Sequence, residues 1–327
     1  RLVNHAFDRE REVAALAVQE AARLCRAVRG SHGPDAVAKG DKSPVTVADF
    51  GSQALICATL KAAFPDDPVM AEEDAAELRS PDRLAVRDRV VAEVNALRPG
   101  TDAETVLGWI DHGNLDRFAP RFWTLDPIDG TKGFLRGEQY AIALALIVEG
   151  RVEVAALACP NLERSQSPVG PVGAVFLAVR GAGATVLPLD GGIAERPIRT
   201  SDRDDPARAR LCESVESGHS AHHESAVVAA RLGVTEPPVR LDSQAKYATV
   251  ASGVADVYLR LPTRADYQEK IWDHAAGALI VTEAGGTVTD IEGKPLDFSL
   301  GSTLANNRGV VATNGPLHDR VLAALRG

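Results

Sequence analysis

Cysteine is scarce in this sequence and shows no paired spacing. The four cysteines, Cys25, Cys57, Cys159 and Cys212, are far apart in a chain of 327 residues. Zinc sites and disulfide frameworks depend on closely spaced or numerous cysteines. The spacing therefore argues against both kinds of site, and we expect buried, reduced thiols in a cytoplasmic protein.

Positive charge is also in short supply. The chain has 36 Lys and Arg against 45 Asp and Glu, which gives a net charge of -9. This balance provides no bulk electrostatic attraction for DNA, RNA or anionic lipid. We therefore expect neither a nucleic-acid polymer nor a membrane as a partner. An anionic substrate would have to be attracted by a local site or by bound cations.

Long apolar runs are missing as well. The longest, residues 141–148, has the length of a strand and is far shorter than the roughly 20 residues of a membrane-spanning helix. No internal repeat or low-complexity segment interrupts the chain. With 45% hydrophobic and 25% charged residues, the composition is that of an ordinary globular protein, large enough for one large unit or two domains.

The pattern of apolar residues changes along the chain. Helical spacing predicts helices over residues 8–29, 48–64 and 75–97, with a polar loop over 39–47 that turns extended at Ser43-Pro44 and a short strand at Val69-Met70. Short turns then join strand-like segments, which favours antiparallel hairpins. The predicted strands are 106–110, 122–125, 141–148, 152–158, 174–179 and 184–187.

A charged, proline-containing stretch over residues 200–209 predicts a domain boundary. We expect an N-terminal α+β domain over residues 1–200 and a smaller α/β domain over residues 201–327. In the second domain strands and helices alternate. The predicted elements are strands 211–215, 257–259 and 309–313, with helices at 224–232, at 247–253 and after Asp273.

The hexapeptide Asp126-Pro127-Ile128-Asp129-Gly130-Thr131 is the segment with the clearest chemistry. Alone, it could be a tight turn, since Asp-Pro and Asp-Gly are turn dipeptides. However, it follows an apolar strand, and Pro127 keeps Asp126 out of a helix. The residues after Asp129 could present backbone N–H groups to a phosphate, either as a helix N-terminus or as a nest.

Three further acidic positions accompany the hexapeptide: Asp49, Glu72 and Asp273. Each has an ordinary interpretation, as a helix cap for Asp49 and Asp273 and as a solvated face for Glu72. If they converge on the hexapeptide, two carboxylates about 4 Å apart repel by roughly 4 kcal/mol at an effective dielectric of about 20. Such a cluster must bind protons or cations. A set of oxygen ligands without clustered Cys or His indicates Mg²⁺ or Mn²⁺.

Several segments together carry a resemblance to a known family. They are the hexapeptide, Trp272-Asp273-His274-Ala275-Ala276-Gly277, Glu283-Ala284-Gly285-Gly286, the stretch 256–262 and Tyr267-Gln268-Glu269-Lys270. From about residue 7 to residue 311 the chain resembles the lithium-sensitive, magnesium-dependent phosphatase superfamily of inositol monophosphatases and fructose-1,6-bisphosphatases. Within it the chain is most similar to the 3′(2′),5′-bisphosphate nucleotidase branch.

The resemblance implies a fold and a ligand set. The fold is a layered α/β sandwich, with a mostly antiparallel N-terminal sheet and a smaller C-terminal α/β part. The cofactor is Mg²⁺, two or three ions per site, replaceable by Mn²⁺. The implied metal ligands are Glu72, Asp126, the Ile128 carbonyl, Asp129 and Asp273, and Asp49 with Thr131 would orient and deprotonate the attacking water. The family usually has Gly where this chain has Ala71, a departure that leaves Glu72 in place.

The resemblance also implies a substrate. The substrate-binding residues would be Gly130, Thr131, His219, Ser243, Lys246, Arg260 and Asp273. The implied reaction is hydrolysis of adenosine 3′,5′-bisphosphate, and of its 5′-phosphosulfate form, as in sulfate assimilation, with Li⁺ as an inhibitor. One alternative is an inositol (poly)phosphate 1-phosphatase of the same superfamily. Another is a catalytically silent sensor of nucleotide or Mg²⁺, which would not need the water-activating pair.

Overall fold

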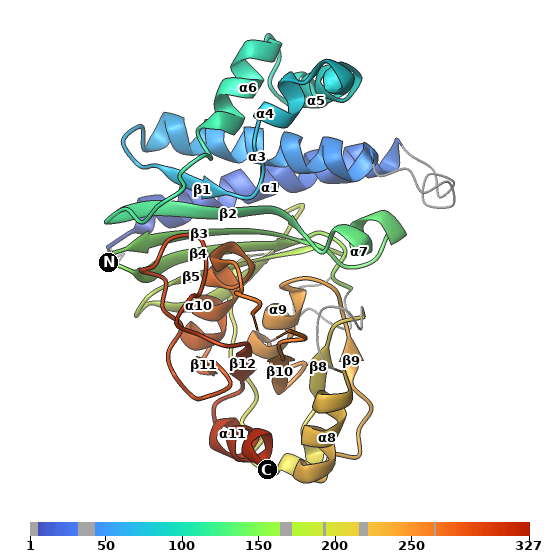
Figure 1. Ribbon diagram of the computed structural model, residues 1–327, viewed down its shortest axis with the longest axis vertical. Coiled ribbons are helices and arrows are strands. Elements are labelled where there is room, and N and C mark those ends of the chain that lie inside the picture. The colour runs from blue at the N-terminus through green and yellow to red at the C-terminus, as the bar shows by residue number, and fades with distance from the viewer. Residues whose placement is uncertain (1–5, 32–42, 164–171, 192–193, 216–221, 265) are drawn as a thin grey trace.

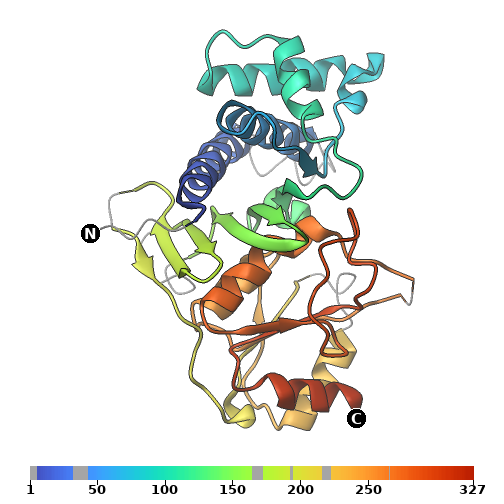
Figure 2. The same ribbon diagram turned by 90° about the vertical axis from the view of Figure 1, so that its left-hand side faces the viewer.

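Two β-sheets stacked between layers of helices organise the chain (Figure 1). The computed structural model describes residues 6–31, 43–163, 172–191, 194–215, 222–264 and 266–327. The helices α4 to α6 form the first layer, followed by α1 with α3, the first sheet, α9 with α10, the second sheet, and α8 with α11. Figure 2 shows the same stack from the side, with α10 between the two sheets. The layered α/β sandwich predicted from the sequence is confirmed.

The first sheet contains seven strands in the order of the chain. β1 and β2 are parallel, and every other neighbouring pair is antiparallel. The strands are β1 (Val69–Ala71), β2 (Arg121–Asp129), β3 (Ala141–Val148), β4 (Arg151–Cys159), β5 (Ala174–Val179), β6 (Gly183–Pro188) and β7 (Arg196–Pro197). Both faces of β3 to β5 are buried because helices cover the sheet on both sides, so these strands are continuously apolar.

Helices α1 (Asp8–Gly30) and α3 (Ser43–Ala63) cover one face of this sheet. The predicted helix over residues 8–29 is confirmed almost to the residue. The predicted loop over 39–47 is wrong at its end, because α3 already begins at Ser43. Pro44 occupies the second helical position, where the backbone needs no N–H donor, so proline starts this helix instead of preventing it.

The segment between β1 and β2 is mostly helical. It contains α4 (Ala76–Arg79), a 3₁₀ turn (Pro81–Arg83), α5 (Leu84–Leu97) and α6 (Ala103–Asp111). The strand predicted over 106–110 is therefore wrong. Asp102 caps α6 by accepting a hydrogen bond from the Thr105 N–H at 2.9 Å, and the spacing of Val106 and Ile110 places both on the buried face.

The second sheet has the order β11-β12-β10-β8-β9 and mixes parallel with antiparallel pairs. Its strands are β8 (Leu211–Glu213), β9 (Val239–Arg240), β10 (Val257–Arg260), β11 (Thr287–Thr289) and β12 (Val310–Thr313). The helices are α8 (His222–Leu232), α9 (Ala245–Ala251), α10 (Ala275–Glu283) and α11 (His318–Arg326). The sequence prediction missed β7, β9 and β11, which are too short to show a pattern, and also missed α11.

Helix α10 packs against strands of the first sheet as well as against α9. Elements from beyond residue 200 thus cover the second face of the N-terminal sheet. The two sheets are formed by residues 69–197 and 211–313, and the division into domains at residue 200 remains a prediction. Among the helices of the described residues, none is both long and apolar enough to span a membrane.

Candidate active site

Glu72 and Asp126 lie together because β1 and β2 are parallel. Ala71 pairs with Leu125 in the register of these strands, so Glu72, directly after β1, lies beside Asp126 of β2. The two carboxyl groups lie close enough for the charge of Glu72 to add to the effect of burial in raising the pKa of Asp126. The sequence could not establish this pairing, because it depends on the register of two strands about 50 residues apart.

An irregularity in β2 adds Asp129 to the same place. Three steps along β2, from Asp126 to Asp129, correspond to two steps along β3, from Ala143 to Ala141. In a regular strand, residues three apart point to opposite faces. The bulge at Pro127-Ile128 reverses one alternation, so both aspartates line the same cleft.

Helix α3 supports the acidic cluster from behind. The Ser52 hydroxyl donates to the Pro127 carbonyl at 2.9 Å and so holds the bulge. The Gln53 amide donates to the Glu73 carbonyl at 2.7 Å and accepts from the Glu73 N–H at 3.0 Å. Asp49, on the same helix and 8% exposed, lies close enough for its charge to act on Glu72, but it does not line the cleft. No hydrogen bond joins Asp49 to Thr131 among the described residues.

Ala71, the departure from the family pattern, is accommodated by a glycine. A Cβ on Gly113 would lie 2.9 Å from the Ala71 Cβ and 2.8 Å from Gln53 Nε2, closer than real Cβ contacts. The Ala71 N–H also donates to the Gly113 carbonyl at 2.9 Å. The methyl group of Ala71 therefore fills space that Gly113 leaves open, and Glu72 keeps its direction.

Asp273 reaches the cluster from the other side of the cleft. It lies in a 3₁₀ turn (Ile271–Asp273) directly before α10. Gln244 connects this turn to β2 by hydrogen bonds. Its backbone N–H donates to Asp129 Oδ2 at 2.5 Å. Its side-chain amide donates to the Trp272 carbonyl at 2.9 Å and accepts from the Gly277 N–H at 3.2 Å. Gln244 thereby fixes Asp129 and Asp273 relative to each other.

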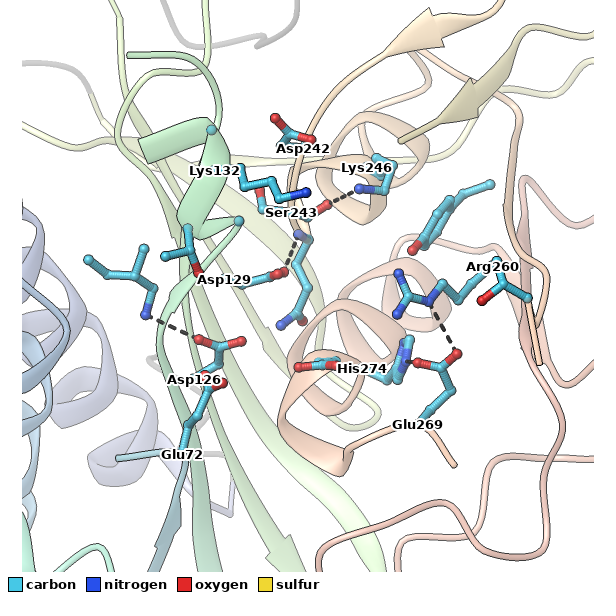
Figure 3. A pocket seen from close by; sticks show the side chains of 18 of the residues that line it. Glu72, Asp126, Asp129, Lys132, Asp242, Ser243, Lys246, Arg260, Glu269 and His274 are labelled. Carbon is cyan, nitrogen blue, oxygen red and sulfur yellow. Dashed lines mark hydrogen bonds and ion pairs between the residues drawn. The ribbon is translucent and has the colours of Figure 1, made fainter. Parts of the chain in front are cut away.

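These groups face a cleft of about 530 Å³. Figure 3 shows Glu72, Asp126 and Asp129 on one wall and Lys246 and Arg260 on the opposite wall. Of the residues predicted from the sequence, the cleft is lined by Glu72, Asp126, Ile128, Asp129, Gly130, Thr131, Ser243, Lys246, Arg260 and Asp273. His219 lies outside the described residues.

The acidic wall is electrostatically strained. Burial, followed by the charges of neighbouring carboxylates with Glu72 first among them, raises the pKa of Asp126 well above its ordinary range. Burial and then Glu73 raise the pKa of Glu72 to about 7, and burial and then Asp129 raise the pKa of Asp273 to about 7. A cluster of this kind either retains protons or binds cations.

The opposite wall carries positively charged side chains. Lys246 is 4% exposed, and its ammonium group donates to the carbonyls of Ser243 at 2.7 Å and Leu241 at 3.2 Å, with no ion pair among the described residues. Burial lowers its pKa, and the charge of Asp129 opposes this effect. Arg260 Nε donates to Glu269 Oε1 at 3.1 Å. Burial alone would raise the pKa of Glu269, but His274 and Arg260 lower it to about 2.

Comparison with known proteins identifies the family of the chain. The sequence profile of the inositol monophosphatase family matches residues 7–327. The chain belongs to the inositol monophosphatase family. It is 47% identical to a 3′(2′),5′-bisphosphate nucleotidase of Emericella nidulans, over 98% of each chain, and 43% identical to one of Schizosaccharomyces pombe, over 97% of this chain and 95% of that one. The structure of Mycobacterium tuberculosis SuhB matches with a TM-score of 0.65 at 23% identity, over 99% and 98% of the two chains.

The inositol monophosphatase family depends on magnesium, and the residues present fit that ion. The converging groups are all oxygen donors, and burial together with the charges of neighbouring carboxylates raises their pKa values, an effect that a bound cation would offset. Glu269, Asp273 and His274 also come within reach of one another. However, both imidazole nitrogens of His274 are hydrogen-bonded, to Tyr247 and to Glu269, which leaves His274 no nitrogen for a metal, and Glu269 is paired with Arg260.

Four supporting residues were not predicted from the sequence: Ser52, Gln53, Gln244 and Glu269. Each contacts a predicted site residue or the backbone next to one. The first three are neutral polar residues without a motif of their own. Glu269 lies in the segment Tyr267-Gln268-Glu269-Lys270, which carries the family resemblance, and this position in the sequence was the one indication that Glu269 belongs to the site.

Proposed function

We propose that this protein is a magnesium-dependent phosphomonoesterase that hydrolyses adenosine 3′,5′-bisphosphate to AMP and phosphate, and that it also accepts the 5′-phosphosulfate form. The observation that carries the proposal is the division of one cleft into an acidic wall and a cationic wall. The acidic wall can bind metal ions that hold the phosphate to be cleaved, and the cationic wall can bind the anionic group that stays on the product.

The proposed ligands of the metal ions are Glu72, Asp126, the Ile128 carbonyl, Asp129 and Asp273. Two or three Mg²⁺ ions would bind there, and Mn²⁺ would replace them. When bound, the metal supplies an activated water and neutralises charge on the leaving oxygen. Thr131, at the start of α7 (Thr131–Arg136), is proposed to orient the attacking water, with Asp49 polarising its hydroxyl.

Gly130 allows the chain to turn close to the substrate. Its φ of 87° is in the left-handed region, and a Cβ there would lie 2.9 Å from the Ser243 Cβ. The backbone of Gly130 and Thr131 is therefore free to approach the phosphate, beside Ser243. Any larger residue at position 130 would push the two walls of the cleft apart.

Lys246, Ser243 and Arg260 are proposed to bind the phosphate that is kept, together with His219. The cleft also offers a surface for a nucleobase: Tyr267 is 37% exposed and lines the cleft, as do Leu261 and Pro262. An exposed aromatic ring beside apolar groups can stack on a base. A cyclitol has no flat face to use this surface, which favours the nucleotide over an inositol phosphate.

Phosphate release from two substrates tests the proposal. With Mg²⁺, we expect kcat/KM for adenosine 3′,5′-bisphosphate to exceed that for inositol 1,4-bisphosphate by at least tenfold, and added Li⁺ to inhibit both reactions. The reverse preference would favour the inositol phosphatase. Tight nucleotide binding without phosphate release would favour a silent sensor. The buried free thiols of the four cysteines support a reducing, cytoplasmic setting as part of the proposal.

Removal of the buried cation Lys246 should separate the two kinds of substrate. We expect Lys246→Ala to raise KM for adenosine 3′,5′-bisphosphate by roughly tenfold to a hundredfold, since a charged hydrogen-bond donor is lost. KM for a monophosphate ester, which has no second anionic group, should change less than threefold. Lys294→Ala, at an exposed lysine paired with Glu292, is the matched control and should leave both values unchanged. Equal effects of Lys246→Ala on both substrates would exclude a second-phosphate site.

A further inference from the structure

A chain of four polar side chains forms part of the cationic wall. The Tyr247 hydroxyl lies 2.7 Å from His274 Nδ1, His274 Nε2 lies 3.2 Å from Glu269 Oε2, and Glu269 Oε1 accepts from Arg260 Nε at 3.1 Å. Tyr247, His274 and Glu269 are almost completely buried, and Arg260 lines the cleft (Figure 3). The chain thus leads from the core to a side chain that faces the ligand space.

The Glu269 carboxylate can only accept, so His274 donates to it from Nε2. The other ring nitrogen of His274, Nδ1, shares a hydrogen bond with the Tyr247 hydroxyl. The polar side-chain atoms of the three buried members, Tyr247, His274 and Glu269, are all hydrogen-bonded, and a satisfied buried network holds its members in one arrangement.

Arg260 benefits most from this arrangement. Glu269 occupies Nε, the inner nitrogen of the guanidinium, so the two terminal nitrogens are left for the neighbouring Tyr267 and for the cleft. A guanidinium fixed in this way presents its planar fork to an anionic group and loses little side-chain entropy when the anion binds.

We propose that Glu269 is a positioning residue that orients Arg260 toward the phosphate the substrate retains, with His274 and Tyr247 holding Glu269 in turn. The identity of that anion rests on the proposed function. Glu269 acts through Arg260 and does not itself touch the substrate, since a carboxylate beside a phosphate would repel it. The proposal explains why a carboxylate lines the cationic wall of an anion-binding cleft.

A double-mutant cycle tests the proposal. Adenosine 5′-monophosphate, which keeps the retained phosphate, is titrated calorimetrically into the wild type, Glu269→Gln, Arg260→Ala and the double variant. We expect Glu269→Gln to raise the Kd about tenfold in the wild-type background and less than twofold in the Arg260→Ala background. A merely structural role would give the same ratio in both backgrounds, and that result would overturn the proposal.

A second variant covers the case in which Glu269→Gln does not fold. Tyr247→Phe removes one hydroxyl but keeps the ring, which packs edge-on against Tyr258 with the centroids 5.0 Å apart. We expect a two- to fivefold higher Kd for adenosine 5′-monophosphate, again only while Arg260 is present; an unchanged Kd would count against the proposal. Phosphate release by the wild type is measured separately. Its absence would reject the proposed reaction, while the cycle would still report whether Glu269 acts through Arg260.

Discussion

We expect Asp126→Asn and Asp273→Asn each to reduce kcat by roughly a thousandfold or more, because each removes a carboxylate that is proposed to bind the metal. Metal ions contribute several kcal/mol of transition-state stabilisation, and about 4 kcal/mol corresponds to a thousandfold in rate. Asn keeps the size and one oxygen of Asp but not the charge that balances a divalent cation. The measurement is the steady-state rate of phosphate release at saturating Mg²⁺, and retention of more than a tenth of the wild-type kcat in either variant would reject the assigned ligands.

Melting temperatures without divalent cations distinguish lost chemistry from lost fold. The pKa of Asp273 is raised to about 7, so its ionised form costs stability. The cost is absent below about pH 4, where the carboxyl is protonated in both the folded and the unfolded states, and it grows to its full size above pH 7. In EDTA at pH 8, Asp273→Asn should therefore melt at the same temperature as the wild type or about 2–5 °C higher.

Asp116→Asn is the control for these variants, and the effect of Mg²⁺ on the melting temperature gives a further test. Asp116→Asn, at an exposed position outside the cleft, should change neither kcat nor the melting temperature. Adding Mg²⁺ should raise the melting temperature of the wild type more than that of Asp126→Asn, because only the wild type keeps the full charge of the cluster. A lower melting temperature of the Asn variants in EDTA would show that the carboxylates stabilise the fold by themselves.

The acidic cluster shows how far the sequence carried the prediction. Asp126 and Asp129 could be placed at a strand end because an apolar strand precedes them and Pro127 blocks a helix. Asp126 meets Glu72 because of the register of β1 and β2, and Asp129 joins them because of a bulge in β2. Neither feature has a local signature, so only the family resemblance connected these positions before the structure did.

The misassigned elements have a common physical cause. Residues 106–110 are rich in β-branched and aromatic types, which generally favour strands. They are helical here because Asp102 caps α6 and because one face of this helix is buried. The long strands β3 to β6 were predicted well because their apolar runs are bounded by short turns. Local preference fails where tertiary packing outweighs it, and the short strands β7, β9 and β11 contain too few residues to show any preference.

The second large effect concerns stability. Asp256 is fully buried directly before β10, and its carboxylate holds the segment that links the two sheets. One of its oxygens accepts from the Ser201 hydroxyl at 2.5 Å, and the other accepts from the Arg210 N–H at 2.7 Å. Arg203 Nε at 3.1 Å and Arg210 Nε at 3.2 Å complete the charge balance.

Asp256→Ala should lower the free energy of unfolding by about 2–4 kcal/mol and the melting temperature by about 5–10 °C. The loss stays below the upper range for buried ion pairs because Arg203 and Arg210 are 25% and 33% exposed and can be hydrated once the carboxylate is gone. Asp202→Ala, an exposed aspartate of the same segment, should shift the melting temperature by less than 1 °C. Because Asp256 is absent from the cleft, kcat at 25 °C should stay within threefold of the wild type. If Asp256→Ala lowered the melting temperature by less than 2 °C, this segment would be held by its backbone contacts and not by the buried carboxylate.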